Sequence, residues 1–343
     1  MEKLKALVTA DLVREDLEKE FGDRVAFTYD GYAVNHDVTP HAKLVEMIKD
    51  FDILICEFDT ISQDVFDAAA KLKIIICCRG GVKTVIDLEA ATARGVMVCN
   101  NAGRNATAVA DMVMGYMLDM TRRITAASTA IHSGAYAGYK AKLPPEYKDA
   151  LWGMDNDSPY IQYRGDSLNH MTLGIVGFGA IGRLIARRAE VFGMKVVTYS
   201  VPALKPEETP DYVTPMSFDE VLKCADIVSV HVPLNPATRG MFGKAQFAAM
   251  KKGSYFVNAA RGPIVVEADL IDALKSGHLA GAALDTLCTE PLPADSPLIG
   301  VKNLLITPHI AGAAYDVQAC GTQLTAASLT AWLEGRQPAM RVA

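Results

Sequence analysis

Short apolar runs rich in β-branched residues alternate with amphipathic stretches along almost the whole chain, and this alternation constrains the fold more than any other feature. A first set of candidate strands comprises residues 4–9, 25–29, 53–56, 74–78 and 96–100. A second set comprises residues 173–177, 196–200, 227–231, 255–259, 280–285 and 304–307. Continuous apolar strands separated by helices are typical of parallel sheets covered on both faces. The pattern therefore predicts an α/β fold of two doubly wound, Rossmann-like domains with a cleft between them.

Length and charge limit the classes of function. At 343 residues, the chain is long enough for two domains of ordinary size. The net charge is −6, from 34 basic and 40 acidic residues, which argues against a protein that holds nucleic acid by its phosphates. No apolar run reaches the roughly 18 residues that a membrane span needs, and the apolar run near the start is too short for a secretion signal. We therefore expect a cytoplasmic protein with no nucleic-acid or membrane partner.

The cysteines predict neither disulfides nor a metal site. There are seven, and four of them (Cys56, Cys77, Cys78 and Cys99) lie inside apolar runs, with no C-x-x-C pair in the chain. A disulfide framework would use an even number of cysteines, so we expect buried free thiols. The chain also lacks the clustered Cys and His ligands of a zinc site, and we expect no metal.

Two helical patterns and one irregular segment complete the organisation. Apolar residues recur at three- and four-residue spacing from 107 to 124, which predicts a long helix between the two strand sets. A last pattern runs from residue 313 to 332 and could pack on either domain. Residues 132–170 break the periodicity and contain Pro144-Pro145, Trp152 and five of the twelve tyrosines. Long loops in compact domains are usually functional or mobile, so this segment is either a subunit contact or part of a substrate wall.

A glycine motif follows the first strand of the second set. Residues 177–182, Gly-Phe-Gly-Ala-Ile-Gly, have the G-x-G-x-x-G spacing, with a strand before them and a helical pattern after them. Gly177 permits a tight turn, Gly179 lets the backbone approach a pyrophosphate, and Gly182 lets helix and strand pack closely. The N-terminus of the following helix presents free N–H groups and a positive dipole end to the phosphates. In this context the motif predicts that NAD or NADP is bound.

The residue that would choose between the two dinucleotides is unusual. A carboxylate about 20 residues after the motif normally accepts the ribose hydroxyls of NAD, but this chain has Ser200 there. Strong selection of NADP would bring an Arg close by to pair the 2′-phosphate, whereas the first cation after Ser200 is Lys205, beyond Pro202. Neither signature is complete. We therefore expect weak discrimination, with NADP(H) as a serious competitor of NAD(H).

Four polar residues fall at or just past the ends of strands in the second set: Arg261, Asp285, Glu290 and His309. In an open parallel sheet, these ends line the crevice where ligands bind. Arg is suited to gripping a carboxylate through two parallel hydrogen bonds, and His changes its charge near neutral pH. A carboxylate beside an imidazole favours the protonated form. Next to a nicotinamide, these side chains predict a site for an anionic 2-hydroxy or 2-keto acid.

With these motifs, the sequence resembles the D-isomer-specific 2-hydroxyacid dehydrogenases, the family that includes phosphoglycerate, glycerate and D-lactate dehydrogenases. The resemblance covers nearly the whole chain. The stretches that carry it are Gly103-Arg104-Asn105-Ala106, the glycine motif, His231-Val232-Pro233-Leu234 and residues 258–264, 281–291 and 307–312.

The resemblance implies a role for each residue of the site. Arg261 would anchor the substrate and activate its carbonyl, His309 would be the general acid/base, and Glu290 would be its partner. Backbone N–H groups of the loop Arg79-Gly80-Gly81 would hold the substrate carboxylate, although the residues after it match the family pattern imperfectly. The implied cofactor contacts are Gly177, Gly179, Ala180, Ile181, Gly182, Ser200, Val232, Pro233, Ala259, Ala260, Arg261, Asp285, His309 and Gly312.

The resemblance also implies a discontinuous first domain. A substrate-binding, flavodoxin-like domain would comprise residues 1–106 with 316–343, and an NAD(P)-binding Rossmann domain would comprise residues 107–315. Family members usually dimerise through the cofactor domain, so a homodimer is expected.

The predicted reaction is hydride transfer between NAD(P)H and a small 2-keto acid bound between the domains. Protonated His309 would deliver a proton to the carbonyl oxygen during reduction. Oxidation would need neutral His309, so it should favour higher pH than reduction. The alternative is a non-catalytic, dinucleotide-sensing regulator of the same fold, like the C-terminal-binding corepressors, which can retain the same three residues. The chain shows no basic arm for recruiting a partner, and we therefore expect the enzyme.

One loop bears on the substrate. Glu57-Phe58-Asp59 follows the third strand, at the predicted mouth of the cleft. In the phosphoglycerate enzymes, this neighbourhood carries arginines that can bind a phosphate. Two carboxylates would instead repel a dianion, which predicts an unphosphorylated acid, and they would suit the hydroxyls of a sugar-derived acid. A solvated loop with no part in binding is the open alternative.

Overall fold

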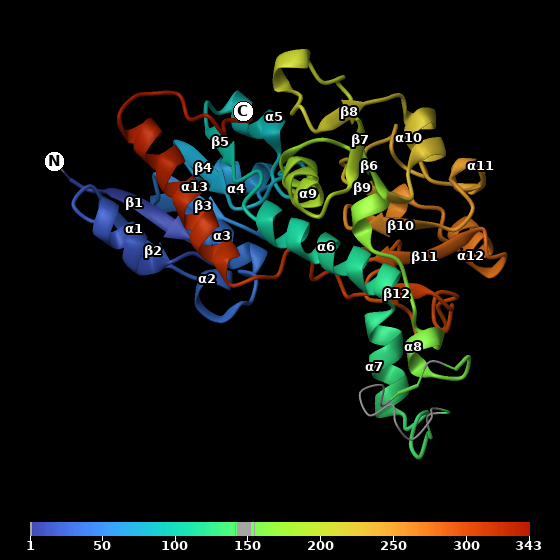
Figure 1. Cartoon of the computed structure of the whole chain (residues 1–343). Coiled ribbons are helices and arrows are strands. Elements are labelled where there is room, and N and C mark those ends of the chain that lie inside the picture. The colour runs from blue at the N-terminus through green and yellow to red at the C-terminus, as the bar shows by residue number, and fades with distance from the viewer. Residues whose placement is uncertain (1, 141, 143–151, 154) are drawn as a thin grey trace. The chain divides into compact units, whose positions relative to one another are not determined.

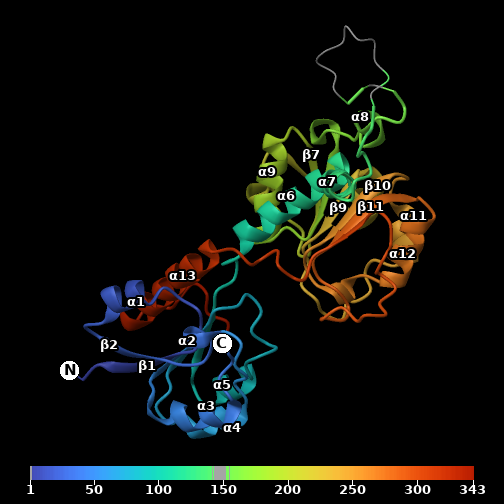
Figure 2. The same cartoon turned by 90° about the horizontal axis from the view of Figure 1, so that it is seen from below.

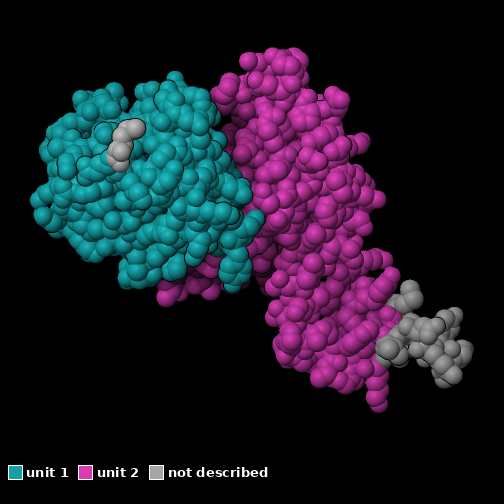
Figure 3. Space-filling model, turned by 90° about the vertical axis from the view of Figure 1, so that its left-hand side faces the viewer, with its two compact units in different colours: residues 1–105, 313–343 teal, residues 106–312 magenta. Residues whose placement is uncertain are grey.

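The computed structural model describes residues 2–140, 142, 152–153 and 155–343. The chain forms two compact units, which are coloured separately in Figure 3. Unit 1 consists of Met1–Asn105 and Ala313–Ala343, and unit 2 of Ala106–Gly312. The chain thus leaves unit 1 and returns to it, and the last helical pattern belongs to unit 1. These bounds lie within three residues of the predicted ones.

Unit 1 is built on a five-stranded parallel sheet with the order β2-β1-β3-β4-β5 (Figure 1). Its strands are β1 (Leu4–Val8), β2 (Val25–Tyr29), β3 (Ile53–Cys56), β4 (Ile74–Cys77) and β5 (Met97–Asn100). All five were expected from the sequence. The chain order reverses between β1 and β3, and in open α/β sheets ligands bind at the carboxyl ends of the strands on either side of such a switch point.

Helices cover both faces of this sheet (Figure 2). They are α1 (Arg14–Phe21), α2 (Tyr32–Asn35), α3 (His41–Met47), α4 (Gln63–Ala68), α5 (Leu88–Ala93) and α13 (Asp316–Leu333). Leu329 of α13 is buried in the same core cluster as Ile55 of β3. Phe66 of α4 is buried in the other cluster, with Leu54. Neighbouring residues of β3 thus enter opposite cores, which is why its sequence is apolar throughout.

Unit 2 is built on a seven-stranded parallel sheet with the order β12-β11-β10-β9-β6-β7-β8. Its strands are β6 (Thr172–Val176), β7 (Lys195–Tyr199), β8 (Val213–Pro215), β9 (Ile227–Val230), β10 (Ser254–Asn258), β11 (Leu279–Leu284) and β12 (Leu304–Ile306). Six of them were expected, and the short edge strand β8 was not. The order reverses between β6 and β9, so the glycine motif after β6 lies at the switch point.

Unit 2 contains seven α-helices in its described residues, and those in its two core clusters cover the faces of its sheet. They are α6 (Ala106–Arg122), α7 (Ile124–His132), α8 (Pro159–Gln162), α9 (Ala180–Val191), α10 (Phe218–Cys224), α11 (Lys244–Ala249) and α12 (Glu267–Lys275). One core cluster contains α6 and α9, and the other contains α10, α11 and α12. The single helix predicted over residues 107–124 is interrupted, because Arg123 adopts the left-handed conformation with a φ of 55°.

The irregular segment of residues 132–170 is described only in part. Pro144-Pro145 lies outside the described residues. Among the described ones, Tyr136 and Tyr139 contact Trp152, with ring centroids 6.4 and 6.5 Å from its own. These three aromatic side chains therefore pack on one another.

Two expectations from composition can be compared with the structure. Cys56, Cys77, Cys78 and Cys99 are buried free thiols, as predicted. In the part of the chain that the structure describes, no helix combines the length and the hydropathy needed to cross a membrane.

Candidate active site

The glycine motif forms the turn between β6 and α9. Gly177 has a φ of 101°, and a Cβ there would lie 2.7 Å from the backbone of His231 and Val232. A Cβ on Gly182 would lie 2.4 Å from the carbonyl oxygen of Gly177. Around Gly179, by contrast, no described atom would lie within 4 Å of a Cβ. Close packing thus requires two of the glycines, and the third leaves open space beside the backbone.

This open space lies at the N-terminus of α9, a helix of 12 residues. The first N–H groups of a helix, here those of Ala180 and Ile181, have no acceptor within it, and Gly179 at the N-cap position has no side chain to accept from them. Free N–H groups and the positive end of the helix dipole favour a phosphate. Val232 and Pro233 follow β9 across the switch point. The cradle therefore fits the pyrophosphate of a dinucleotide.

Ser200 follows β7 directly and is partly exposed. Nζ of Lys205, the cation identified in the sequence, lies 3.7 Å from Oε1 of Glu208 in an exposed ion pair. Sequence reasoning missed a second cation, because Arg183 precedes Ser200 in the chain. The guanidinium of Arg183, on α9, donates to the carbonyl oxygen of Glu208 at 2.7 Å and stacks on the ring of Phe178. Both cations are thus tied to Glu208.

The predicted acid/base residue and its predicted partner are in contact. Nδ1 of His309 lies 2.8 Å from Oε2 of Glu290, and Oε1 of Glu290 accepts from the amide of Leu287 at 2.8 Å. The His309 side chain is 47% exposed. Because the carboxylate engages Nδ1, Nε2 is the ring nitrogen that is left to exchange a proton with a ligand.

A buried carboxylate holds the backbone around His309. Asp285 is 1% exposed, and its two oxygens accept from the amides of Ile310 and Ala311, each at 2.9 Å. Its carbonyl oxygen accepts from the amide of His309 at 2.8 Å. Gly312, another implied cofactor contact, ends unit 2 just beyond. This geometry gives Asp285 a structural role, and its contact with the nicotinamide stays a prediction.

Tyr116 belongs to the same network, although the sequence did not single it out. Its hydroxyl lies 2.5 Å from Oγ1 of Thr307 and 3.1 Å from Oδ1 of Asp285, and the Thr307 hydroxyl donates to Asp285 at 2.7 Å. Burial raises the pKa of Tyr116 well above its ordinary value, so the hydroxyl remains a donor at neutral pH. In the sequence, Tyr116 is one apolar position of a helical repeat, and only the fold brings it to the strand ends.

Arg261 lies at the carboxyl end of β10 with an exposed side chain. The side chain of Asn258, which is fully buried, donates to the carbonyl oxygen of Arg261 at 3.0 Å and accepts from the amide of Ala260 at 3.1 Å. The Arg261 guanidinium donates to the carbonyl oxygen of Ala260 at 2.6 Å. Ala259, between them, is buried. Asn258 thus fixes the loop, and the guanidinium is left accessible to an anion.

In unit 1, the loop predicted to hold a carboxylate follows β4. The guanidinium of Arg79 lies over the ring of Phe58, 5.3 Å from its centroid. The carbonyl oxygen of Gly80 accepts from the side chain of Asn100 at 2.7 Å. Gly81 is exposed, with no described atom within 4 Å of a Cβ position. The loop is therefore fixed on one side and open at its tip.

The two acids after β3 are buried, and the prediction that they are exposed is wrong. Glu57 and Asp59 were expected at the mouth of a cleft or in a solvated loop, but they are only 3% and 2% exposed. Glu57 forms an ion pair with Arg104, which is 47 residues away in the chain. Oδ2 of Asp59 accepts from the hydroxyl of Thr9 at 2.6 Å. Glu57 is neutralised by its partner, and Asp59 is buried, so the predicted repulsion of a phosphate at an open cleft mouth cannot rest on them.

Comparisons with known proteins agree with this geometry. The family described as D-isomer specific 2-hydroxyacid dehydrogenase, NAD binding domain, matches residues 114–311. A glyoxylate reductase of Thermofilum pendens is 36% identical over 300 residues, which is 86% of this chain and 82% of that protein. A D-3-phosphoglycerate dehydrogenase of Rattus norvegicus is 35% identical over 285 residues, which is 82% of this chain and only 49% of that protein. The structure of D-lactate dehydrogenase with NAD⁺ from Lactobacillus jensenii has a TM-score of 0.78 and 26% identity, covering 99% of this chain and 100% of that chain.

Proposed function

The chain belongs to the D-isomer specific 2-hydroxyacid dehydrogenase family, and on this premise we propose that it reduces unphosphorylated 2-keto acids with Arg261, Glu290 and His309 as its catalytic residues. As a member of this family, it is an NAD(P)-dependent oxidoreductase that acts on 2-keto and 2-hydroxy acids. No observation favours the non-catalytic regulator. The contact between His309 and Glu290 is the observation that carries the assignment of roles.

Each of the three residues has a task that follows from its surroundings. When bound, the reduced nicotinamide supplies the hydride. The exposed guanidinium of Arg261 binds the substrate carboxylate and draws electron density toward the carbonyl oxygen. Protonated His309 donates from Nε2 to that oxygen, while Glu290 at Nδ1 orients the ring and stabilises the imidazolium. For oxidation of a 2-hydroxy acid, neutral His309 takes up the hydroxyl proton.

The proposed cofactor is NAD or NADP with weak discrimination between them. The glycine turn, the segments after β9 and β10 and residues 309–312 would hold the dinucleotide. Ser200 has no carboxylate to accept the ribose hydroxyls of NAD or to repel the 2′-phosphate of NADP. Lys205 pairs with the Glu208 carboxylate, and Arg183 donates one N–H group to the Glu208 carbonyl oxygen. Neither is an arginine that directly follows β7, so the signature of an NADP-selective site stays incomplete.

Unit 1 is proposed as the substrate-binding domain. The tip of the loop Arg79-Gly80-Gly81 is open, and its backbone N–H groups would bind the substrate carboxylate. Of the cations at these strand ends, Arg104 is paired with Glu57 and so is not available to a phosphate. Arg79 lies over the ring of Phe58 and has no carboxylate partner among the described residues. The unphosphorylated substrate remains the proposal, and the substrate panel tests it.

A homodimer is proposed through α7. This helix has no buried residue, and its Ile124 and Ile131 are half exposed. Trp152 and Tyr160, from the irregular segment, are also exposed. Large exposed apolar side chains gathered on one element mark interaction surfaces. Sedimentation of the wild type should give the mass of a dimer, and replacing Ile124 and Ile131 together by Lys should give a monomer; a monomeric wild type would contradict this part.

The experiment that tests the proposed reaction is a substrate panel. The purified protein is mixed with NADH or NADPH and with glyoxylate, pyruvate, hydroxypyruvate or phosphohydroxypyruvate, and loss of the reduced nicotinamide absorbance is followed. We expect turnover of unphosphorylated acids with both cofactors. Absence of turnover with every acid, from a protein shown to bind the cofactor, would favour the regulator, and a preference for phosphohydroxypyruvate would contradict the substrate class.

A further inference from the structure

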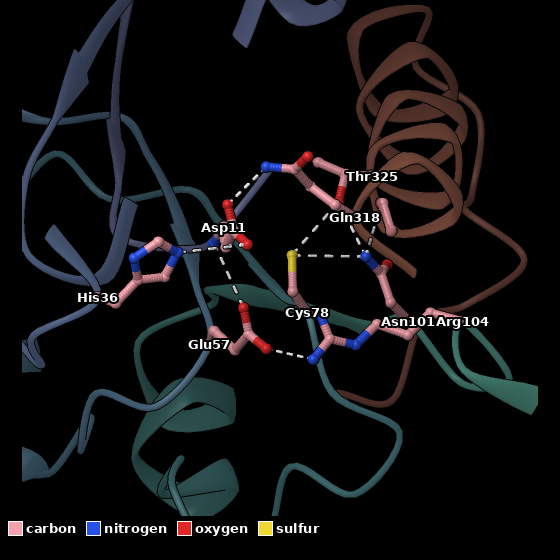
Figure 4. Close-up of polar contacts among 9 residues, drawn as sticks. Asp11, His36, Glu57, Cys78, Asn101, Arg104, Gln318 and Thr325 are labelled. Atoms are coloured by element: carbon pink, nitrogen blue, oxygen red, sulfur yellow. Dashed lines mark hydrogen bonds and ion pairs between the residues drawn. The ribbon is translucent and has the colours of Figure 1, made fainter. Parts of the chain in front are cut away.

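The carboxyl ends of the unit 1 strands carry a polar cluster that the reaction described above does not use (Figure 4). Asp11 follows β1, and Glu57 follows β3, so these two acids stand on either side of the switch point. His36 follows α2, Arg104 follows β5, and Gln318 lies in the first turns of α13. In open α/β sheets, ligands bind at such a point. This cluster contains both acidic and basic side chains, which can accept and donate hydrogen bonds.

Asp11 is the more accessible of the two acids in the cluster, and its neighbours hold it in place. Its Oδ1 accepts from the side-chain amide of Gln318 at 2.6 Å, and its Oδ2 lies 3.8 Å from Nε2 of His36. Its amide donates to Oε2 of Glu57 at 3.3 Å. The Asp11 side chain is 35% exposed and that of His36 is 68% exposed, whereas Glu57 and its partner Arg104 lie behind them at 4% and 17%.

Two buried acceptors at the same strand ends have no donor among the described residues. They are Oδ1 of Asp59, which is 2% exposed, and Oδ1 of Asn101, which is fully buried. Buried polar atoms normally have a partner from protein or water. Asp59 is tied to β1 through Thr9, so its unpaired oxygen lies at the switch point. Unsatisfied acceptors here favour a ligand that brings hydroxyl donors.

The spacing between the strands indicates how far a ligand at these strand ends would extend. The proposed carboxylate loop follows β4, and Asp11 follows β1, with β3 between them in the sheet. Neighbouring strands lie about 4.8 Å apart, so the two strand ends are separated by roughly 10 Å. An acid that reaches toward both strand ends is therefore longer than glyoxylate or pyruvate. Phe58 follows β3 and Tyr32 begins α2, and their ring centroids are 4.7 Å apart.

We propose that the substrate of this enzyme is a sugar-derived acid, hydroxylated beyond C2, and that Asp11 is the residue that recognises its distal hydroxyl groups. The proposal rests on the proposed function, because it places the carboxylate at the Gly80-Gly81 loop. Asp11 accepts from a hydroxyl, and His36 contacts the same end of the chain. A phosphate at that end would face the Asp11 carboxylate, so the distal group is neutral. The sequence predicted that Glu57 and Asp59 would suit the hydroxyls of a sugar-derived acid. We assign this role to Asp11 instead.

The test compares acids of equal length with and without distal hydroxyls. Oxidation of 2-hydroxybutyrate and of its 3,4-dihydroxy counterparts is measured with NAD⁺ and NADP⁺ for the wild type, Asp11→Asn and Asp23→Asn. Asp23 is a matched control, because its side chain is 78% exposed and it precedes β2, at the amino ends of the strands rather than the carboxyl ends. We expect the wild type to favour a hydroxylated acid in kcat/KM by at least about 100-fold, since a site that binds a hydroxyl rejects the analogue without it.

Asp11→Asn should lower that ratio by roughly tenfold or more, and Asp23→Asn should leave it unchanged. Thermal unfolding of both variants checks that they fold. A wild type that turns over 2-hydroxybutyrate as well as the hydroxylated acids would overturn the proposal, and so would an Asp11→Asn variant that folds and keeps the wild-type ratio. If no 2-hydroxy acid of either kind is oxidised, the proposed function itself fails instead.

Discussion

Glu290 contacts both the imidazole of His309 and the backbone beside it. One oxygen lies 2.8 Å from Nδ1 of His309, and the other accepts from the amide of Leu287 at 2.8 Å. The hydrogen bond from the Leu287 amide therefore holds the Glu290 carboxylate in position to contact the imidazole. This arrangement sets the ring orientation, so that Nε2 is the nitrogen left for proton transfer.

Replacing Glu290 by Gln should lower kcat by roughly 10- to 100-fold, because the amide makes the contact without the charge that stabilises the imidazolium. Steady-state rates of 2-keto acid reduction measure this effect. Glu267→Gln is a suitable control, because Glu267 also bonds a backbone amide of this loop, that of Cys288 at 2.7 Å, but does not contact His309. Equal losses in the two variants would mean that Glu290 acts only by holding the loop.

Tyr116→Phe should disturb the active site from within the core. The change removes the hydroxyl that contacts both Thr307 and Asp285, and a lost buried hydrogen bond costs about 1–3 kcal/mol of unfolding free energy. Because the Asp285 side chain holds the amides of Ile310 and Ala311, directly after His309, kcat should fall more than KM rises. Denaturant unfolding and steady-state kinetics of the variant check both effects; wild-type kcat in the destabilised variant would show that the network does not position His309.

Ser200→Asp should shift cofactor preference sharply toward NAD. A carboxylate at the end of β7 accepts the ribose hydroxyls of NAD and repels the 2′-phosphate of NADP. The kcat/KM ratio for the two cofactors is the readout, and the wild type should favour NAD by less than about 100-fold, which corresponds to roughly 2.7 kcal/mol. A larger NAD preference in the wild type, unchanged by the substitution, would mean that another group already fills the role of the carboxylate.

His231 should make the fold sensitive to acid. Burial lowers the pKa of His231 to about 3, whereas an unfolded histidine has a pKa of about 6.5. Between these values, the unfolded chain binds a proton that the folded chain does not, so stability falls as pH falls below about 6.5, by roughly 2 kcal/mol at pH 5. His231→Gln should remove this part of the loss between pH 7 and pH 5, and the exposed control His132→Gln should not. Equal pH slopes in all three proteins would contradict the assignment.

Much of the fold could be predicted because apolar runs report burial directly. The strand β3, with four buried residues in a row, could only lie inside a sheet covered on both faces. The strand β8 escaped prediction because it has three residues, lies at an edge and ends at Pro215. The break at Arg123 also escaped, because the apolar repeat continues through it and the left-handed backbone leaves no trace in the pattern.

Some residues of the candidate site could also be predicted from the sequence, and others could not. Arg261, Glu290 and His309 could be proposed from the sequence because each follows a strand within a recognisable motif. The burial of Glu57 could not be foreseen, since it depends on Arg104 from another strand end. Tyr116 was hidden because a buried tyrosine in a helical repeat looks like any other core residue. Contacts between distant segments decide these cases, and local spacing carries no information about them.

The measurement that tests the central claim most directly is single-turnover reduction of an accepted 2-keto acid by His309→Gln, with the binding of the reduced cofactor measured in parallel by fluorescence. The account predicts that the rate constant of the chemical step falls by about 10²- to 10⁴-fold, while the cofactor still binds and the exposed control His170→Gln reacts like the wild type. A His309→Gln variant that binds the cofactor and reduces the acid at the wild-type rate would contradict it.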